Sequence, residues 1–513
     1  MGRQVGALIA YIERIIMGIG MRTDTIAAIA TAFSESGIGI IRISGEDAFR
    51  IADRIFFGKK DFAEFQRSED KAHFQKKYFL EDAKTYTLHY GYIMDDGKLI
   101  DEVLASVMRA PKSYTAENVV EINCHGGILV LRKVMDLIIK NGARVAEPGE
   151  FTKRAFLNGR MDLSEAEAVM DLIQSKNEFA LEASVSQLKG SVSSIIKELR
   201  GKIIYEVAFI ESALDDPENY STDGYGERLL SVLEETGNKI EELISHADDG
   251  RILKEGIRTV ILGKPNAGKS SFLNELLGEE KAIVTDIAGT TRDALEENIR
   301  LGGVSLHMID TAGIRKTEDI VEKIGVEKAR KYAAEADLII YIVDSSVDLD
   351  ESDEEILEIL KDKHFIVLLN KSDLNTVVTE KEILDKLQLF FNGMLKDKKR
   401  EDHFIEDHVK IIKISALQHQ GIEEFEETVK KMFFDGKVSF NSEVIITSMR
   451  HKEALLEARD SLLMVKQSIE DGMSEDFYSV DLMNAYAALG RIIGEEVGDD
   501  LVNEIFEKFC MGK

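Results

Sequence analysis

Residues 263–270 constrain the fold of this chain more than any other stretch, because they read Gly-Lys-Pro-Asn-Ala-Gly-Lys-Ser. An apolar run over residues 259–262 precedes them and is typical of a buried strand. Residues 271–277 follow with the pattern of a helix. A strand, a glycine-rich loop and a helix in this order predict a phosphate-binding P-loop in a parallel-sheet domain.

The residue types in this loop suit the binding of phosphate. Glycines let backbone N–H groups approach phosphate oxygens, and the helix N-terminus adds a partial positive charge. We expect Lys269 to reach the terminal phosphates and the Ser270 hydroxyl to bind Mg²⁺. The alternative is a glycine-rich turn with a lysine placed there by chance, and it leaves the flanking strand and helix unexplained.

Two later stretches resemble the parts of a GTP site. Residues 310–313 (Asp-Thr-Ala-Gly) follow an apolar strand, so Asp310 would hold Mg²⁺ through water and the Gly313 N–H would sense the γ-phosphate. Residues 370–373 (Asn-Lys-Ser-Asp) also follow a strand. Their last carboxylate can accept hydrogen bonds from N1–H and the N2 amine of guanine, a donor pair that adenine lacks.

Two more stretches complete the predicted site. Residues 415–417 (Ser-Ala-Leu) would support guanine through their backbone. Residues 289–293, which include Thr290 and Thr291, form a switch segment that can ligate Mg²⁺ and the γ-phosphate. All these segments occur in the expected order, and together they predict GTP binding.

One position departs from the Ras-like pattern. Ile314 follows residues 310–313, where Ras-type enzymes have a glutamine that orients the attacking water. An apolar side chain cannot orient water, so either hydrolysis is slow or another group does this work. The candidates in the following switch are Arg315, Glu318, Asp319 and Glu322.

Composition limits the class of protein. The 513 residues are enough for about three or four domains, and 44% of them are hydrophobic. The formal charge of -29 argues against non-specific coating of nucleic acid, so any RNA contact must be local or shared with a basic partner. Only Cys124 and Cys510 are present, without a disulfide or zinc pattern, which suits a cytoplasmic protein.

The amino-terminal residues do not predict a membrane segment. No apolar run is long enough to span a bilayer, so we expect no membrane partner. Glu13 and Arg14 interrupt the apolar stretch that a signal peptide would need. We therefore expect residues 1–21 to be an upstream extension, with Met21 as a plausible start.

The pattern of apolar residues predicts a multidomain fold, α/β plus all-α. Strand-type runs and a hairpin around residues 95–98 indicate a mixed α/β domain, with residues 59–84 as a charged surface insertion. Helical spacing dominates the region before the P-loop domain and returns after it, with a stripe of Val497, Leu501, Ile505 and Phe509. The predicted regions are an extension (1–21), a mixed α/β domain (22–157), a first helical segment (158–253), a Ras-like P-loop domain (254–437) and a second helical segment (438–513). The two helical segments should therefore pack together as one domain around an inserted nucleotide domain.

From about residue 22 the whole chain resembles the MnmE/TrmE family of tRNA-modification GTPases. The motifs that carry this resemblance lie mostly outside the nucleotide segments. They are Gly-Ile-Ile-Arg-Ile-Ser-Gly (39–45), Arg-Ala-Pro-Lys-Ser-Tyr-Thr-Ala-Glu-Asn (109–118), Glu-Ile-Asn-Cys-His-Gly-Gly (121–127), Pro-Gly-Glu-Phe-Thr-Lys-Arg-Ala-Phe-Leu-Asn-Gly-Arg (148–160) and Phe-Cys-Met-Gly-Lys (509–513). The family usually has Ile or Leu where Met511 stands.

The resemblance implies a function and partners. It implies a homodimer formed by an N-terminal domain that binds 5-formyltetrahydrofolate or a related one-carbon folate. It implies a K⁺- and Mg²⁺-dependent GTPase that works with the FAD-containing protein MnmG/GidA. Together the two proteins would add an aminomethyl or carboxymethylaminomethyl group to carbon 5 of the wobble uridine of tRNA.

Matching the motifs position by position assigns the residues. The folate positions are Arg42, Glu121, Arg160 and Lys513. The K⁺ positions are Asn266, Thr285, Ile287 and Thr290, and the Mg²⁺ ligands are Ser270 and Thr291. The catalytic candidates are Glu322, which would orient water, with Lys269, Thr291 and Cys510. The GTP-binding set is Asn266, Ala267, Gly268, Lys269, Ser270, Ser271, Thr285, Asp286, Ile287, Ala288, Gly289, Thr290, Thr291, Asp310, Thr311, Ala312, Gly313, Asn370, Lys371, Asp373, Ser415, Ala416 and Leu417.

Other interpretations remain open from the sequence. One is a ribosome-assembly GTPase of the Era or Der type, but no GXXG-clamp module is apparent after residue 437. Another is a GTP-switched scaffold without hydrolysis, which Ile314 would favour. Glu322 could be an ordinary solvated residue and Cys510 an apolar filler. For Cys124 and His125 we favour packing over metal binding, because neighbours on a strand point to opposite faces and no further ligands are nearby in the sequence.

Overall fold

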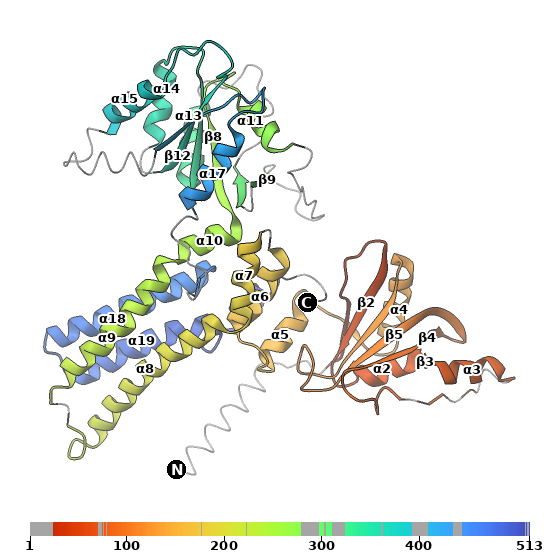
Figure 1. Ribbon diagram of the computed structural model, residues 1–513. Helices are drawn as coiled ribbons and strands as arrows, with labels where there is room; N and C mark the ends of the chain where they lie inside the picture. The colour runs from red at the N-terminus through yellow and green to blue at the C-terminus, as the bar shows by residue number, and fades with distance from the viewer. Residues whose placement is uncertain are drawn as a thin grey trace. The chain divides into compact units, whose positions relative to one another are not determined.

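The computed structural model describes residues 24–69, 74, 76–77, 79–175, 177–221, 223–278, 297–301, 304–309, 324–360, 363–391, 409–433, 444–507, 509 and 512. The chain divides into two compact units. The helices and strands are labelled in Figure 1. The first contains Met1–Met170, Gln187–Leu230 and Asp460–Lys513, and the second contains Asp171–Ser186 and Ser231–Arg459. The expected extension over residues 1–21 lies outside the described residues, and the domain boundaries drawn from the sequence remain predictions.

A seven-stranded sheet forms the amino-terminal region of the first unit, with the order β3-β4-β5-β6-β2-β1-β7. All its pairings are antiparallel except that of β1 with β7. Its hairpin turn is the predicted one, since Asp96 and Gly97 both have positive φ, at 43° and 83°. The strands are β1 (Ile26–Ile29), β2 (Ser36–Ser44), β3 (Phe56–Gly58), β4 (Thr87–Asp95), β5 (Lys98–Met108), β6 (Val119–Gly126) and β7 (Arg144–Val145).

Helices cover one face of this sheet. Helices α2 (Ala48–Ile55) and α4 (Ile128–Lys140) bury apolar side chains with the inward-facing residues of the strands in a single core. Leu88, Tyr90 and Leu104 are exposed large apolar residues of β4 and β5, and Tyr90 pairs in register with Leu104. Residues two apart on a strand share a face, so these side chains form an uncovered apolar area on the sheet.

The prediction that residues 59–84 form an irregular surface insertion is wrong in part. Helix α3 spans Lys59–Arg67, and Leu80 is fully buried in the sheet core. The Asp53 carboxylate accepts the backbone N–H groups of Phe79, Leu80 and Glu81 at 3.1–3.2 Å. The segment is therefore anchored to α2 by a contact far away in sequence, which local charge could not reveal.

The helices before and after the nucleotide domain pack together, as predicted. In the first unit, the Arg200 guanidinium of α8 lies 3.8 Å from the ring centroid of Tyr486 in α19. A Cβ on Gly490 would lie 3.0 Å from the same guanidinium, so glycine permits the close approach. The helices are α5 (Glu150–Leu157), α6 (Leu163–Gln174), α7 (Glu178–Leu188), α8 (Ser191–Asp215), α9 (Tyr225–Ser245), α10 (Ala247–Glu255), α18 (Met449–Glu470), α19 (Glu475–Ile493) and α20 (Asp499–Glu507).

The expected apolar stripe at the carboxyl end is confirmed in part, because Phe509 is buried and Val497 and Ile505 pack partly buried against the same cluster. Val502, Phe506 and Phe509 are the residues buried there, together with Leu163 and other apolar residues of α6. Helix α20 spans only Asp499–Glu507, so a stripe drawn from residue 497 to residue 509 runs beyond both of its ends. The most buried residues of α20 are therefore Val502 and Phe506, next to the predicted stripe.

The nucleotide domain is a six-stranded sheet in the second unit, with the order β13-β12-β11-β8-β10-β9. Only the edge strand β9 is antiparallel to its neighbour. One core lies between the sheet and helices α11 and α17, and another between the sheet and α13, α14 and α15. The strands are β8 (Ile257–Leu262), β9 (Glu297–Leu301), β10 (Val304–Met308), β11 (Leu338–Asp344), β12 (His364–Asn370) and β13 (Val409–Lys413). The helices are α11 (Lys269–Leu276), α13 (Ile324–Glu335), α14 (Glu351–Ile359), α15 (Glu380–Phe391) and α17 (Ile422–Phe433).

The two sheets, with a helical region between them in the sequence, confirm the expected multidomain fold of α/β plus all-α type. None of the helices that the structure describes is both long and apolar enough to cross a membrane.

Candidate functional site

The P-loop has a backbone that only certain residues can adopt. Gly263, Asn266 and Gly268 have φ values of 153°, 62° and 100°. A Cβ on Gly263 would lie 2.4 Å from the Ile342 carbonyl oxygen, and one on Gly268 would lie 2.0 Å from the Asn370 amide nitrogen. The two glycines therefore leave room for the neighbouring strands, and asparagine tolerates the left-handed region at the exposed tip of the loop.

Lys269, at the start of α11, is folded back onto the loop. Its ammonium group donates to the carbonyl oxygens of Gly263 and Lys264, both at 2.7 Å. Burial lowers the pKa of Lys269 below its usual range. A buried cation whose described partners are neutral carbonyls favours the arrival of an anion, and the neighbouring helix N-terminus adds to that preference.

Asn370 connects the P-loop to the segment expected to support guanine. Its amide nitrogen donates to the Ala267 carbonyl at 2.8 Å, and its amide oxygen accepts the Ala416 N–H at 3.1 Å. Asp373 accepts a 2.6 Å hydrogen bond from the Ser415 hydroxyl. Three segments that are far apart in the sequence thus meet at the carboxyl edge of the sheet, as the motifs predicted.

Two supporting interactions were not anticipated from the sequence. Lys264 forms ion pairs with Asp350 at 3.0 Å and with the buried Asp353 at 2.7 Å, which links the P-loop to α14. Lys371 forms an ion pair with Asp344 at the end of β11. Burial acts to raise the pKa of Asp344, but hydrogen bonds from Lys371 and Ser346 outweigh it and leave the pKa lowered. Asp344 ends an apolar strand, and Asp350 and Asp353 lie at the start of α14, but the partners of all three acids are set by the tertiary fold.

The remaining nucleotide candidates are only partly described. Ser270 and Ser271 lie in the first turn of α11, and both residues are exposed. Leu417 is 81% exposed, so the outer side of the guanine segment is open. The predictions for residues 285–291, residues 310–313 and Glu322 fall outside the described residues, and so does the K⁺ set apart from Asn266.

A second candidate site lies in the first unit, around the Tyr114 ring. Arg42 and Glu121 face each other in the β2–β6 register, and their side chains form a 2.8 Å ion pair. The guanidinium groups of Arg42 and Arg160 lie 5.1 Å and 4.9 Å from the Tyr114 ring centroid. The carboxyl end of the chain also reaches this cluster, because the Gly512 carbonyl accepts a hydrogen bond from Arg42 at 3.3 Å. Three of the four predicted folate residues are therefore together, and Lys513 and Cys510 lie outside the described residues.

Tyr114 was not among the predicted site residues, and buried charges hold its segment. Arg154 is 7% exposed and donates to Glu117 at 3.2 Å and to Glu150 at 2.9 Å. Glu117 in turn accepts a 2.6 Å hydrogen bond from Ser44 of β2. Residues 109–118 are thereby fixed between β2 and α5, so the ring has a defined position.

Cys124 and His125 do not form a metal site with any further ligand among the described residues. Cys124 is buried in the sheet core, and burial raises its pKa to about 12. His125 points to the other face, where its Nδ1 lies 2.6 Å from the Asp101 carboxylate. The burial of Cys124 agrees with the prediction that it packs in the core. The Asp101–His125 pair was not predicted.

The geometry of the second unit defines a class of protein. A mainly parallel sheet, a P-loop after β8 and an Asn-Lys-Ser-Asp loop after β12 define a Ras-like P-loop GTPase domain, which is here inserted between α10 and α18.

Comparison with known proteins then identifies the family. A family profile described as "MnmE helical domain" matches residues 163–510, and one described as "GTP-binding protein TrmE N-terminus" matches residues 25–160. The chain belongs to the MnmE family of tRNA-modification GTPases, which confirms the resemblance drawn from the motifs. This membership decides against the Era or Der alternative, because the matches cover the N-terminal and helical regions.

Individual relatives agree with this assignment over nearly the whole chain. A protein of Lachnoclostridium phytofermentans named "tRNA modification GTPase MnmE" is 53% identical, covering 96% of this chain and 100% of that protein. Proteins of the same name from Acetivibrio thermocellus and Clostridioides difficile are 46% and 47% identical, each over 96% of this chain and 100% and 99% of their own length. Among solved structures, Aquifex aeolicus Era bound to GDP and AlF4⁻ is 26% identical over 41% of this chain and 67% of that chain, with a TM-score of 0.23.

Proposed function

We propose that this chain is a potassium-stimulated GTPase that acts with an FAD-containing partner of the MnmG/GidA type on carbon 5 of the tRNA wobble uridine. As a member of the MnmE family it is a GTP-hydrolysing enzyme of tRNA modification. The observation that carries the nucleotide half of the proposal is the position of Asn370, which bonds both the P-loop and the 415–417 segment. The Asn370 side-chain amide thus joins the P-loop, which would bind the phosphates, to residues 415–417, which would bind guanine.

The trigger for hydrolysis would be a monovalent cation. Ile314 cannot orient water, so positive charge and a positioned water must come from elsewhere. Asn266 supports a cation site because it is exposed at the tip of the P-loop, beside the phosphates that the loop would hold. Thr285, Ile287 and Thr290 would complete the K⁺ shell, Ser270 and Thr291 would bind Mg²⁺, and Glu322 would orient the water.

The cluster around Tyr114 would bind a one-carbon folate such as 5-formyltetrahydrofolate. Arg42 and Arg160 offer positive charge to the glutamate tail or to ring oxygens, and Glu121 can accept hydrogen bonds from the N–H groups of a pterin. The Tyr114 ring, which lies close to both arginines, adds a flat apolar surface of the kind that ring systems stack upon. Lys513, next to Gly512, would add charge, and Cys510 would take part in the modification.

A homodimer would cover the open face of the N-terminal sheet. Leu88, Tyr90 and Leu104 expose 57%, 41% and 38% of their surface there, which is unusual for an area of this kind on a monomer. Sedimentation of the intact protein tests this proposal. Replacing Leu88 and Leu104 with serine should shift the dimer toward monomer, and a purely monomeric wild type would contradict it.

Nucleoside analysis tests the proposed function most broadly. A strain without this gene should lose the C5-modified wobble uridine in a mass-spectrometric digest of its tRNA. The wild-type gene should restore the nucleoside, whereas Lys269→Ala should not, because the P-loop ammonium group is needed for phosphate binding. Unchanged wobble uridine in the deletion strain would refute the proposed substrate.

A further inference from the structure

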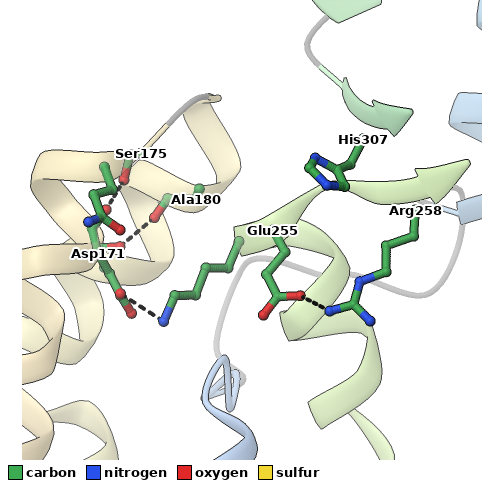
Figure 2. Close-up of a pocket in the computed structure, with 9 residues that line it drawn as sticks. Asp171, Ser175, Ala180, Glu255, Arg258 and His307 are labelled. Carbon is green, nitrogen blue, oxygen red and sulfur yellow. Dashed lines mark hydrogen bonds and ion pairs between the residues drawn. The ribbon is translucent and has the colours of Figure 1, made fainter. Parts of the chain in front are cut away.

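A cavity of about 300 Å³ with mainly polar residues in its walls lies near the amino-terminal end of β8 (Figure 2). The P-loop follows the other end of this strand. The walls of the cavity come from α6 and α7 on one side and from α10, β8 and β10 on the other. All of these residues belong to the second unit. The lining residues are Asp171, Gln174, Ser175, Ala180, Ser184, Lys254, Glu255, Arg258 and His307.

Two polar contacts connect the walls of this cavity. Lys254 near the end of α10 forms a 2.8 Å ion pair with Asp171 of α6, whose side chain is only 9% exposed. The Asn177 amide nitrogen donates to the Leu253 carbonyl at 3.1 Å, while its oxygen accepts the Ala180 N–H and caps α7. The α6–α7 hairpin is thus held to α10 by one hydrogen bond and one ion pair beside a cavity. Close-packed apolar cores resist rearrangement, whereas a polar contact of this kind can be exchanged for water.

The nucleotide-side wall is firmly joined to the strands that carry the phosphate-binding segments. Asp337 forms a 2.6 Å ion pair with Arg251 of α10 and accepts the backbone N–H of Arg258 in β8 at 3.0 Å. Arg258 pairs in register with His307 of β10. Strand β8 ends at the P-loop, and β10 ends two residues before Asp310. A shift of either strand would therefore displace α10, the helix that carries Lys254, through the Asp337 contacts and the pairing of β8 with β10.

Helix α6 continues from the cavity to the carboxyl-terminal segment. It runs without a break from Leu163 to Gln174, about 18 Å for twelve residues. At its first end, Leu163 is buried in a cluster that also contains Phe506 and Phe509. Gly512, three residues beyond Phe509, is the residue that contacts Arg42. One helix thus joins the cavity to the segment that completes the Tyr114 cluster.

We propose that the Asp171–Lys254 ion pair transmits the nucleotide state of the GTPase domain to α6, and through α6 to α20 and to Gly512 beside the folate-type site. The proposal rests on the proposed function, because it requires β8 and β10 to respond to GTP hydrolysis. Asp171 and Lys254 are positioning residues, since neither lies at the phosphate or guanine segments.

Hydrogen exchange on the full-length protein tests this link. Exchange is compared between GDP and GDP–AlF4⁻ with K⁺, in peptides that cover α6 and α20. The wild type should show a nucleotide-dependent difference in both helices, and Asp171→Asn should reduce that difference about threefold to tenfold. Glu242→Gln is the matched control, because it removes an exposed i,i+3 pair with Lys239, which should contribute little.

A charge exchange separates the ion pair from a general loss of structure. Lys254→Gln should behave like Asp171→Asn, and the double variant D171K/K254D should recover most of the wild-type difference. GTP turnover of all variants should stay within about twofold of the wild type, because no phosphate contact is altered. This readout also shows that each variant is folded.

Three results would overturn the link. They are a wild type whose α6 and α20 do not respond to the nucleotide, single variants with the full wild-type response, and a double variant as weak as either single one. Wobble modification that persists in the deletion strain would instead count against the proposed function. The two failures are distinguishable because the exchange measurement contains neither tRNA nor the partner protein.

Discussion

At the scale of single residues, Asp373 sets the choice of base in this account. Its carboxylate is held by the Ser415 hydroxyl at 2.6 Å, and the residue is exposed. Asp373→Asn should weaken GTP binding by about 2–4 kcal/mol, because an amide presents a donor to the donors of guanine. A competition titration of GTP against ATP measures this, with Glu423→Gln on α17 as the control. Unchanged GTP preference in Asp373→Asn would refute the guanine assignment.

His125 offers a second test at this scale, through its pKa. Hydrogen bonding to Asp101 raises the imidazole pKa above its usual 6.5. A raised pKa in the folded state means that the pair stabilises the protein below the usual pKa, and that this contribution is lost as the pH rises through the folded value. Asp101→Asn should move the His125 titration midpoint, measured by NMR, to lower pH. The same midpoint in both proteins would show that the pair does not form in solution.

At the scale of elements, the packing of α20 on α5 depends on Gly149. This residue has a φ of 67°, and a Cβ on it would lie 2.4 Å from the Phe506 carbonyl oxygen. Gly149→Ala should destabilise the protein by about 2–4 kcal/mol, from backbone strain together with the displacement of α20. The free energy of unfolding in urea measures the loss.

Gly159→Ala provides a matched control for this effect. Gly159 has nearly the same φ, 68°, but a Cβ there would meet no atom within 4 Å. Its replacement should therefore cost only the strain, about 1–2 kcal/mol. Because α20 leads to Gly512, only Gly149→Ala should also weaken binding of 5-formyltetrahydrofolate in calorimetry. Equal losses for the two variants would contradict the role of α20.

The same elements show what the sequence can and cannot predict. Three features were predictable because each depends on neighbouring residues. They are the P-loop, the hairpin at residues 95–98 and the position of each nucleotide motif directly after a strand. The burial of Leu80 was missed, because the Asp53 carboxylate that fixes it is 27 residues away. The links of Lys264 to Asp353 and of Tyr114 to the two arginines were missed for the same reason. Resemblance to the family found Arg42, Glu121 and Arg160, which no local pattern would have grouped.

At the scale of the whole molecule, the insertion of the GTPase domain is the main feature. Helices α8 and α19 pack together through Arg200 and Tyr486. In the sequence, the whole nucleotide domain separates these two residues. The chain therefore enters and leaves the nucleotide domain from one helical framework. In such a design, GTP hydrolysis in the inserted domain must be communicated to this framework, which makes the trigger of hydrolysis the central question.

If a monovalent cation triggers hydrolysis, Asn266 of the P-loop has a specific role as its ligand. Ile314 leaves no side chain to orient water at the usual position, so a cation beside the phosphates would supply the missing charge. Several carbonyl oxygens and the Asn266 amide oxygen could surround K⁺, whereas the smaller Na⁺ would draw the loop tighter. Asn266 has a φ of 62°, so Asn266→Gly removes the amide without strain and accompanies Asn266→Ala as a control.

Steady-state GTP turnover in K⁺ and in Na⁺ tests this account most directly. The wild type should turn over GTP at least about tenfold faster in K⁺, the effect of removing about 1.4 kcal/mol from the barrier. Both Asn266 variants should lose most of this stimulation while they still bind GTP. Equal wild-type rates in the two salts, or Asn266 variants that keep the full response to K⁺, would contradict the proposed mechanism.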